Sequence, residues 1–164
     1  MIIVITGTPG TGKTTLSSII SKKLDNSYRH IEVAELVKTR NLYSKFDEEW
    51  QSYIVDDDKV VDALAEEAAS GNCIIDTHDV CLVPDNVDLI VVLRTDHTLL
   101  WDRLKQRSYS DRKIQENNDA EIMNVVLEEA TQVGQDLEIE VIERQNDTVD
   151  DQNENIKWLL ERLK

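Results

Sequence analysis

The chain alternates short runs of hydrophobic residues with longer segments in which hydrophobic residues recur every three or four positions. Residues 1–6 form the first apolar run, and hydrophobic residues follow at helical spacing over 14–25. Further apolar runs at 72–76 and 89–93 are separated from the first by another segment of helical spacing, 56–71. Short strands between amphipathic helices are typical of a parallel sheet covered on both faces. The pattern therefore predicts an α/β fold.

The rest of the chain continues this alternation, with one irregular stretch at 41–55 that holds four of the aromatic residues. Two of these, Trp50 and Tyr53, are open to either of two roles: filling the core or stacking against a substrate base. The other predicted elements are a strand at 30–33, a helical turn at 34–40, a helix capped by Asp96 or Thr98 and ending near Arg107, a polar break at 108–113, a helix to about 129, a strand at 137–142, a solvated acidic turn at 147–154 and a closing helix at 155–164. We find no repeat and no linker, so we expect residues 1–164 to form a single domain.

Composition restricts the classes of partner. With 18 basic and 33 acidic residues the formal net charge is −15. Such a charge repels nucleic-acid phosphates and anionic membranes, so we expect neither a broad nucleic-acid surface nor a membrane partner, and it favours basic proteins. A merely soluble acidic surface is the alternative, and for the charge taken alone it is the better explanation. Cys73 and Cys81 lack the spacing of a zinc site, and the opening apolar stretch is too short for a signal peptide, which favours an intracellular protein.

The strongest chemical signal lies between the first strand and the first helix. Residues 7–14 read Gly-Thr-Pro-Gly-Thr-Gly-Lys-Thr and match the phosphate-binding pattern G-x-x-x-x-G-K-[ST] at every fixed position. The glycines let backbone N–H groups turn toward an anion, and the helix that follows adds the positive end of its dipole. Lys13 is suited to the outer phosphates and the Thr14 hydroxyl to Mg²⁺. A glycine-rich turn without chemistry is disfavoured by the strand and helix on either side, so we predict that the chain binds a nucleoside triphosphate.

Two further polar residues lie at the end of the strand at 72–76 and just beyond it. Asp76 ends that strand, where open α/β sheets bind their ligands, and an acid there is suited to hold Mg²⁺ through metal-bound water. His78 lies two residues on and is a candidate to orient a nucleophile or water, or to sense the γ-phosphate. An ordinary loop histidine is the alternative, and the neighbouring acid favours the functional role.

Arginines are the next candidates, because their planar guanidinium groups neutralise the charge that spreads over a moving phosphoryl group. Arg103 and Arg107 lie four apart on one predicted helix face, and a surface salt-bridge pair is the competing role. Their position before the lid-like polar break favours the functional role, most clearly for Arg107. Within the break, Arg112 and Lys113 either close over phosphates or are solvated charges. Arg94, directly after a strand, is also expected to point to the ligand.

These residues together resemble the adenylate kinase isoenzyme 6 family along nearly the whole chain. The P-loop alone fits many kinases, whereas the Asp-x-His and Leu-Arg-Thr-Asp elements together are far more specific. The segments that carry the resemblance are 6–15, 43–50, 54–58, 75–78 with Pro84, 91–96, 103–109 and 120–130. The arrangements typical of serine hydrolases or glycosidases are absent, and so is the N-K-x-D pattern that specifies guanine in GTPases.

The resemblance implies a three-layer P-loop kinase fold with five parallel strands, a short acceptor-binding insert near 32–55 and a small lid near 106–116. The nucleotide contacts that it implies are Gly10, Gly12, Lys13, Thr14, Thr15 and Arg107. It also assigns Asp76 and His78 to a motif associated with triphosphate hydrolysis. Members of the family are described as nuclear and cytoplasmic nucleoside monophosphate kinases and ATPases. They bind a small-subunit ribosomal protein and act in maturation of the small subunit and its 18S rRNA.

Three positions depart from the family pattern. Ser108 stands where glycine is usual, which is expected to stiffen the lid hinge because serine avoids positive φ. Lys38 stands where an arginine is common in the acceptor insert, so the charge is kept and the bidentate fork is lost. Cys81 replaces an acid after the Asp-x-His motif.

We therefore expect an ATP- and Mg²⁺-dependent nucleoside monophosphate kinase with a slower ATPase activity, with AMP, CMP and dAMP as candidate acceptors. The predicted catalytic residues are Lys13, Asp76, His78 and Arg107, and the predicted metal ligands are Thr14 and Asp76. One alternative is an ATPase assembly factor that binds and releases a basic ribosomal protein. A second alternative is a kinase of small metabolites on the same scaffold.

Overall fold

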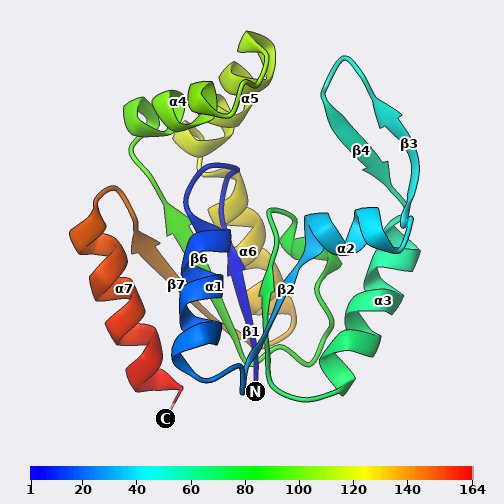
Figure 1. The fold of residues 1–164 in the computed structure, drawn as a ribbon, viewed down its shortest axis with the longest axis vertical. Helices are drawn as coiled ribbons and strands as arrows, with labels where there is room; N and C mark the ends of the chain where they lie inside the picture. Colours follow the sequence, from blue (N-terminus) through cyan, green and yellow to red (C-terminus); the bar gives the residue numbers. More distant parts are fainter. Residues whose placement is uncertain (164) are drawn as a thin grey trace.

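In the computed structural model, which describes residues 1–163, five parallel strands form one sheet in the order β2-β5-β1-β6-β7 (Figure 1). The strands are β1 (Ile2–Thr6), β2 (Arg29–Glu32), β5 (Cys73–Asp76), β6 (Leu89–Arg94) and β7 (Glu140–Gln145). The predicted α/β class and the five-stranded parallel sheet are confirmed. Lys164, the last residue of the predicted closing helix, lies outside the described residues.

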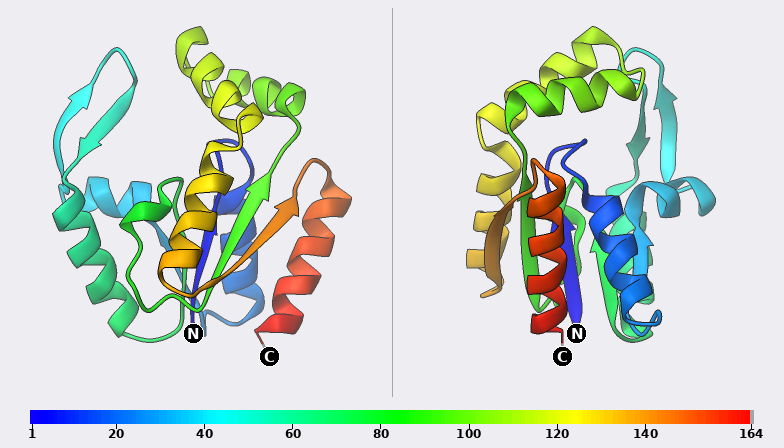
Figure 2. Two further views of the ribbon diagram at one scale, coloured as in Figure 1. Left: turned by 180° about the vertical axis from the view of Figure 1, so that it is seen from behind. Right: turned by 60° about the vertical axis from the view of Figure 1, so that its left-hand side comes forward.

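Helices cover both faces of this sheet, because the buried strands carry apolar side chains on both sides. Ile3 and Ile5 of β1 pack with α1 (Lys13–Lys23) and α7 (Val149–Arg162) on one face. Their neighbours Ile2 and Val4 face α2 (Val33–Thr39), α3 (Asp57–Ala69) and α6 (Val125–Asp136) on the other. The left view of Figure 2, seen from behind, has α6 in front of the sheet, whereas α1 is in front in Figure 1. In residues 1–163, no helix combines the length and the apolar character that crossing a bilayer requires.

The segment at 41–55 is not irregular as predicted but forms an antiparallel hairpin, β3 (Tyr43–Asp47) and β4 (Ser52–Val55). Three of its aromatic rings pack across the two strands: Tyr53 lies 4.5 Å from Tyr43 and 5.1 Å from Phe46, measured between ring centres. Cross-strand aromatic pairs stabilise this hairpin, whose remaining residues are mostly polar or exposed. The hairpin stands away from the sheet near the carboxyl ends of the strands (Figure 1).

The predicted lid region is a pair of helices, α4 (His97–Gln106) and α5 (Asp111–Ile122). Of the two predicted caps for α4, Asp96 is the one observed: its side chain accepts from the backbone N–H of Thr98 at 2.9 Å. The two helices share a small core of their own, formed by Leu100, Leu104 and Ile114. The polar break is shorter than predicted, because Ser110 caps α5 and starts it at Asp111.

Two predictions for the C-terminal half are wrong. The helix predicted to continue to about 129 is broken between α5 and α6, where Asn124 adopts a φ of 58° that an α-helix cannot contain. The acidic stretch at 147–154 is mostly helix, since Thr148 and Asp151 form a reciprocal capping box at the start of α7. Acids in a first turn favour this helix because they face the positive end of its dipole.

Candidate active site

The P-loop leaves β1 and enters α1 through a tight curve that only glycine can follow at several points, two of which contact other strands or loops. Gly7 and Gly12 have φ values of 145° and 97°. A β-carbon on Gly7 would lie 2.4 Å from the carbonyl oxygen of Leu93, and one on Gly12 would lie 2.5 Å from Nδ2 of Asn146. The loop is therefore pressed against β6 and against the residue that follows β7, and the first N–H groups of α1 are held at the carboxyl edge of the sheet.

Lys13 is held inside this curve. Its side chain is 9% exposed, and its Nζ donates to the carbonyl oxygens of Gly7 at 2.8 Å and Thr8 at 3.1 Å. The pKa of Lys13 is lowered from 10.5 to about 8, mainly by burial; the Asp76 carboxylate opposes this shift, and the nearby Arg107 adds to it. A polyphosphate at this site would favour the charged form and reverse the shift.

The four residues predicted to be catalytic, Lys13, Asp76, His78 and Arg107, line one cavity of about 610 Å³. The cavity lies at the carboxyl edge of the sheet, between the P-loop, the hairpin and the lid helices. Strand β5 brings Asp76 there because β5 lies directly beside β1 in the sheet. One cavity therefore unites residues that are up to 94 positions apart in the sequence, from Lys13 to Arg107.

Asp76 and Thr14 give this cavity oxygen ligands. Asp76 is buried, and one of its carboxylate oxygens lies 3.4 Å from Nε2 of His30 on the neighbouring strand β2. Thr14 is exposed at the start of α1 and lines the same cavity. A hydroxyl and a carboxylate are the kinds of ligand that Mg²⁺ accepts beside phosphates and water. The residues present therefore fit the predicted metal.

His78 lies in the cavity wall two residues beyond Asp76. Its ring keeps some contact with solvent, yet the surrounding protein removes part of its hydration and lowers its pKa below the ordinary value of 6.5. The positive charge of Lys13 adds to this effect, while Asp79 opposes it. His78 therefore lines the same cavity as Lys13 and Asp76, and its role there stays a prediction.

A second cavity of about 370 Å³ lies on the other side of the P-loop. Gly10, Gly12 and Thr15 line it together with the turn between β7 and α7, and the nucleotide contacts predicted for them stay predictions. Arg107, exposed at the C-terminal end of α4, lines both cavities. A group that moves from one cavity to the other would pass beside its guanidinium.

Two other arginines have roles that differ from the predictions. Arg103 is neither a free phosphate ligand nor half of a surface salt bridge: it donates to the backbone carbonyl oxygens of Asn146 at 3.1 Å and Asp147 at 2.7 Å. It thereby fixes one wall of the second cavity. Arg94 does not point to the ligand but is bound by the buried carboxylate of Glu121, with 2.7 Å between Nε and Oε1.

The tip of the hairpin touches the lid across the first cavity. Lys113 Nζ donates to the carbonyl oxygen of Gln51 at 2.8 Å, and Arg112 forms an ion pair with Glu49. The guanidinium of Arg112 also lies 4.1 Å from the ring centre of Trp50, a cation–π contact. Of the two predicted roles for Trp50, core filling is not observed, and stacking against a substrate base stays a prediction; Trp50 lines the cavity and its ring contacts the lid. We call these contacts, between residues 49–51 and 112–113, the hairpin–lid contact.

Three further residues of the site were missed in the sequence. His30 contacts Asp76, Glu121 contacts the P-loop through Thr8, and Asn146 donates from Nδ2 to the carbonyl oxygen of Thr11 at 2.7 Å. A signal for Asn146 existed, because polar residues that follow a parallel strand lie at the ligand edge. The strand predicted at 137–142 ended too early to reveal it.

Comparison with known proteins agrees with this geometry. A family model described as "AAA domain" matches residues 3–124. An "Adenylate kinase isoenzyme 6 homolog" from Schizosaccharomyces pombe is 50% identical over 129 residues, 78% of this chain and 73% of the relative. A protein of the same name from Dictyostelium discoideum is 42% identical over 96% of this chain and 88% of its own. A crystal structure of shikimate kinase from Bacteroides thetaiotaomicron has a TM-score of 0.64 at 20% identity, covering 99% of this chain and 98% of the other, which shows a shared P-loop kinase fold.

Proposed function

Because the chain belongs to the adenylate kinase isoenzyme 6 family, we propose that this P-loop nucleotide kinase transfers the γ-phosphoryl group of ATP to a nucleoside monophosphate. AMP is the first acceptor to test, and CMP and dAMP are further candidates. One observation carries the proposal: Lys13, Asp76, His78 and Arg107 line a single cavity, and Arg107 is shared with the cavity on the other side of the P-loop. Donor and acceptor would meet beside this guanidinium.

The reaction needs little covalent chemistry from the protein. An oxygen of the acceptor phosphate forms a bond to the γ-phosphorus while the bond to the β–γ bridging oxygen breaks, and its electron pair leaves with ADP. Lys13 and Arg107 stabilise the negative charge that spreads over the transferred group, and the cavity walls hold the reactants in line. Mg²⁺, when bound, neutralises charge on the phosphate oxygens, and Thr14 and Asp76 are the residues that would hold it.

A second activity, ATP hydrolysis, is supported by the position of His78. A ring nitrogen in the cavity wall can accept a hydrogen bond from water and so orient it toward the γ-phosphorus. The net charge of −15 favours attraction of a basic protein, and we propose a small-subunit ribosomal protein as that partner. The protein would then act in maturation of the small ribosomal subunit, in nucleus and cytoplasm. The second candidate function is an ATPase assembly factor that binds and releases this partner.

The test is a coupled assay of ADP formation over a panel of nucleoside monophosphates. It compares the parent with Lys13→Ala and His78→Ala, and Lys22→Ala serves as a matched control because it removes an exposed lysine from the far end of α1. We expect Lys13→Ala to lose both activities, His78→Ala to lose hydrolysis while keeping transfer, and the control to keep both.

Three results would change the proposal. If the parent phosphorylates no acceptor in the panel, the kinase activity is wrong. If phosphate release without acceptor rises strongly when a basic small-subunit ribosomal protein is added, the assembly role is favoured. Equal loss of both activities in His78→Ala would remove the role given to that residue.

A further inference from the structure

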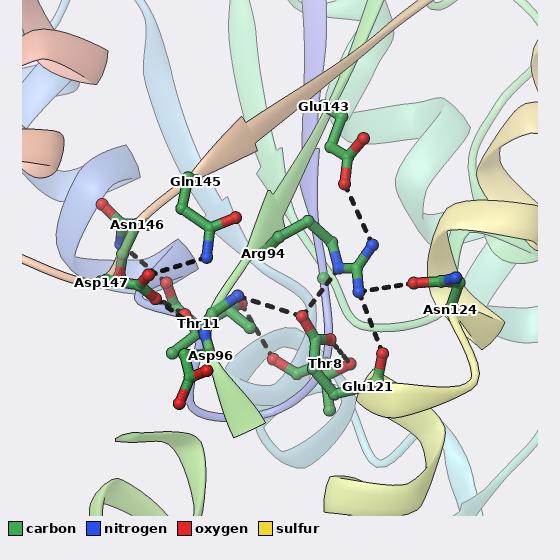
Figure 3. A network of polar contacts seen from close by, with 12 residues as sticks. Thr8, Thr11, Arg94, Asp96, Glu121, Asn124, Glu143, Gln145, Asn146 and Asp147 are labelled. Carbon is green, nitrogen blue, oxygen red and sulfur yellow. Dashed lines mark hydrogen bonds and ion pairs between the residues drawn. The ribbon is translucent and has the colours of Figure 1, made fainter. Parts of the chain in front are cut away.

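A buried carboxylate outside both cavities joins the lid helix to the P-loop (Figure 3). Glu121, near the end of α5, is 3% exposed. Its Oε2 accepts from the hydroxyl of Thr8 at 2.5 Å, and its Oε1 accepts from Nε of Arg94 at 2.7 Å and from the backbone N–H of Thr95 at 3.0 Å. Three donors from two other elements therefore fix the position of this side chain.

Arg94 supplies the compensating charge that a buried carboxylate needs. Its Nη2 donates to the backbone carbonyl of Glu121 at 3.0 Å and to Oδ1 of Asn124 at 2.7 Å. Its Nη1 donates to Glu143 on β7 at 3.0 Å. The guanidinium thus anchors the end of α5 to β6 and β7, and leaves one oxygen of Glu121 for the P-loop.

Thr8, which donates to this oxygen, also takes part in the hydrogen bonds within the P-loop. Thr8 is 1% exposed. Its carbonyl oxygen accepts from the backbone N–H of Thr11 at 3.2 Å, from the Thr11 hydroxyl at 2.9 Å and from Nζ of Lys13 at 3.1 Å. Fixing Thr8 by its side chain therefore fixes the carbonyl group that sets the curve of the loop and the direction of Lys13.

We propose that Glu121 is a positioning residue for the donor site: its charged hydrogen bond to Thr8 holds the P-loop in the curve that receives the triphosphate. A hydrogen bond to an ionised, buried acceptor is stronger than a neutral one, and it prepares the loop before ATP arrives. Helix α5 has 12 residues and a length of about 18 Å. The other end of α5 forms the hairpin–lid contact, so Glu121 also connects the helix that carries this contact to the P-loop.

The inference rests on the proposed use of ATP as donor, and its test measures ATP binding directly. Isothermal titration calorimetry compares the parent with Thr8→Val, which keeps the shape of the side chain and removes the hydroxyl. We expect the Kd for ATP to rise about tenfold, the effect of losing a hydrogen bond to a charged group. Thr8→Ser restores the hydroxyl and is expected to bind ATP within about twofold of the parent.

Glu121→Gln and the double variant show whether the two residues act through the same bond. Glu121→Gln is expected to weaken ATP binding by a similar factor, and the double variant to bind no worse than the weaker single variant, because the bond can be lost only once. Glu143→Gln is the matched control: it removes the other carboxylate on Arg94 but does not touch Thr8. We expect this control to keep the parental Kd.

Kinetics separate a positioning role from a structural one. In Thr8→Val the KM for ATP should rise while the KM for the acceptor stays constant and kcat falls by less than KM rises. A lower Tm with parental Kd and KM for ATP would overturn the inference, since Glu121 would then act on stability alone; additive losses in the double variant would overturn it too. If the parent binds ATP and phosphorylates no acceptor, only the proposed function fails.

Discussion

The two sides of the first cavity, the P-loop side and the hairpin side, are held by different kinds of contact. On the donor side, Glu121 and Asn146 hold the P-loop through buried hydrogen bonds to Thr8 and Thr11. On the acceptor side, the hairpin reaches the lid through exposed side chains such as Glu49 and Arg112. Exposed ion pairs contribute about 0–1 kcal/mol, whereas a buried bond to a charge contributes about 1.5–3 kcal/mol.

The difference suits a preformed P-loop on one side of the cavity and a contact that opens easily on the other. A donor loop that is fixed in advance binds triphosphate without reordering its backbone, so little binding energy is spent there. Under the proposed function, a weak contact between hairpin and lid would break to admit the acceptor and form again to exclude water. The predictions below test this contrast.

Arg107→Ala should have the largest effect, because this residue lines both cavities and, in the proposed reaction, would lie beside the transferred phosphoryl group. We expect phosphoryl transfer at saturating substrates to fall by about 10³-fold, the scale reported for an arginine that neutralises transferring phosphoryl charge. A stopped-flow or coupled assay of kcat measures it, and Lys105→Ala on the same helix is the exposed control. A loss confined to KM for ATP would place Arg107 in donor binding alone.

The pKa of Lys13 makes ATP binding depend on pH. The free protein holds Lys13 with a pKa of about 8, and the charged form binds phosphate, so binding takes up a proton above pH 8. The affinity for ATP therefore falls as the pH rises. At pH 9 Lys13 is charged in only about one molecule in eleven, so the Kd rises about tenfold relative to pH 7.

Calorimetry between pH 7.5 and 9.5, with EDTA to exclude metals, measures this dependence. Lys13→Gln cannot titrate in this range, and its weaker binding should change little with pH. A parental Kd that is constant to pH 9.5 would mean that the pKa of Lys13 is not lowered in the free protein.

The sequence predicted the parts of this site that follow from local chemistry. The P-loop was evident because each fixed residue of its pattern has a definite task around a phosphate chain. Asp76 was found because an acid at the end of a parallel strand lies at the edge of the sheet where ligands bind. Lys13, Asp76, His78 and Arg107, which were predicted to be catalytic, line one cavity, and their catalytic roles stay predictions. Helices with apolar stripes and buried strands were also found near their observed bounds.

What the sequence did not reveal depends on contacts between distant segments. Arg94 and Arg103 looked like ligand-facing arginines because their positions are right, yet Glu121 and the carbonyl oxygens after β7 take up their donors. Those acceptors lie 27 and 43 positions away. The hairpin was missed for a related reason, since its exposed strands lack the apolar alternation that marks a half-buried strand and are stabilised by aromatic packing.

Breaking the hairpin–lid contact should have a small effect. For Arg112→Gln we expect the KM for the acceptor to rise by no more than about fivefold and the Kd for ATP to stay constant, because an exposed pair contributes at most about 1 kcal/mol. Glu49→Gln should have the same effect, and the double variant should add nothing to it. Steady-state kinetics and calorimetry measure the two quantities. A change in ATP affinity as large as that expected for Thr8→Val would contradict the contrast between the two sides.

The smallest effect concerns the turn that leads into the lid. Ser108 was expected to stiffen the hinge by avoiding positive φ, and instead it adopts a φ of 58°. A non-glycine residue in this region is strained, so Ser108→Gly should raise the free energy of unfolding by about 0.5–1 kcal/mol and the Tm by about 1–3 °C. Ser110→Gly should act in the opposite direction by a few tenths of a kcal/mol, because Ser110 caps α5 through the N–H of Lys113. Thermal unfolding of the two variants decides the matter: a lower Tm for Ser108→Gly would mean that the turn into the lid is unstrained.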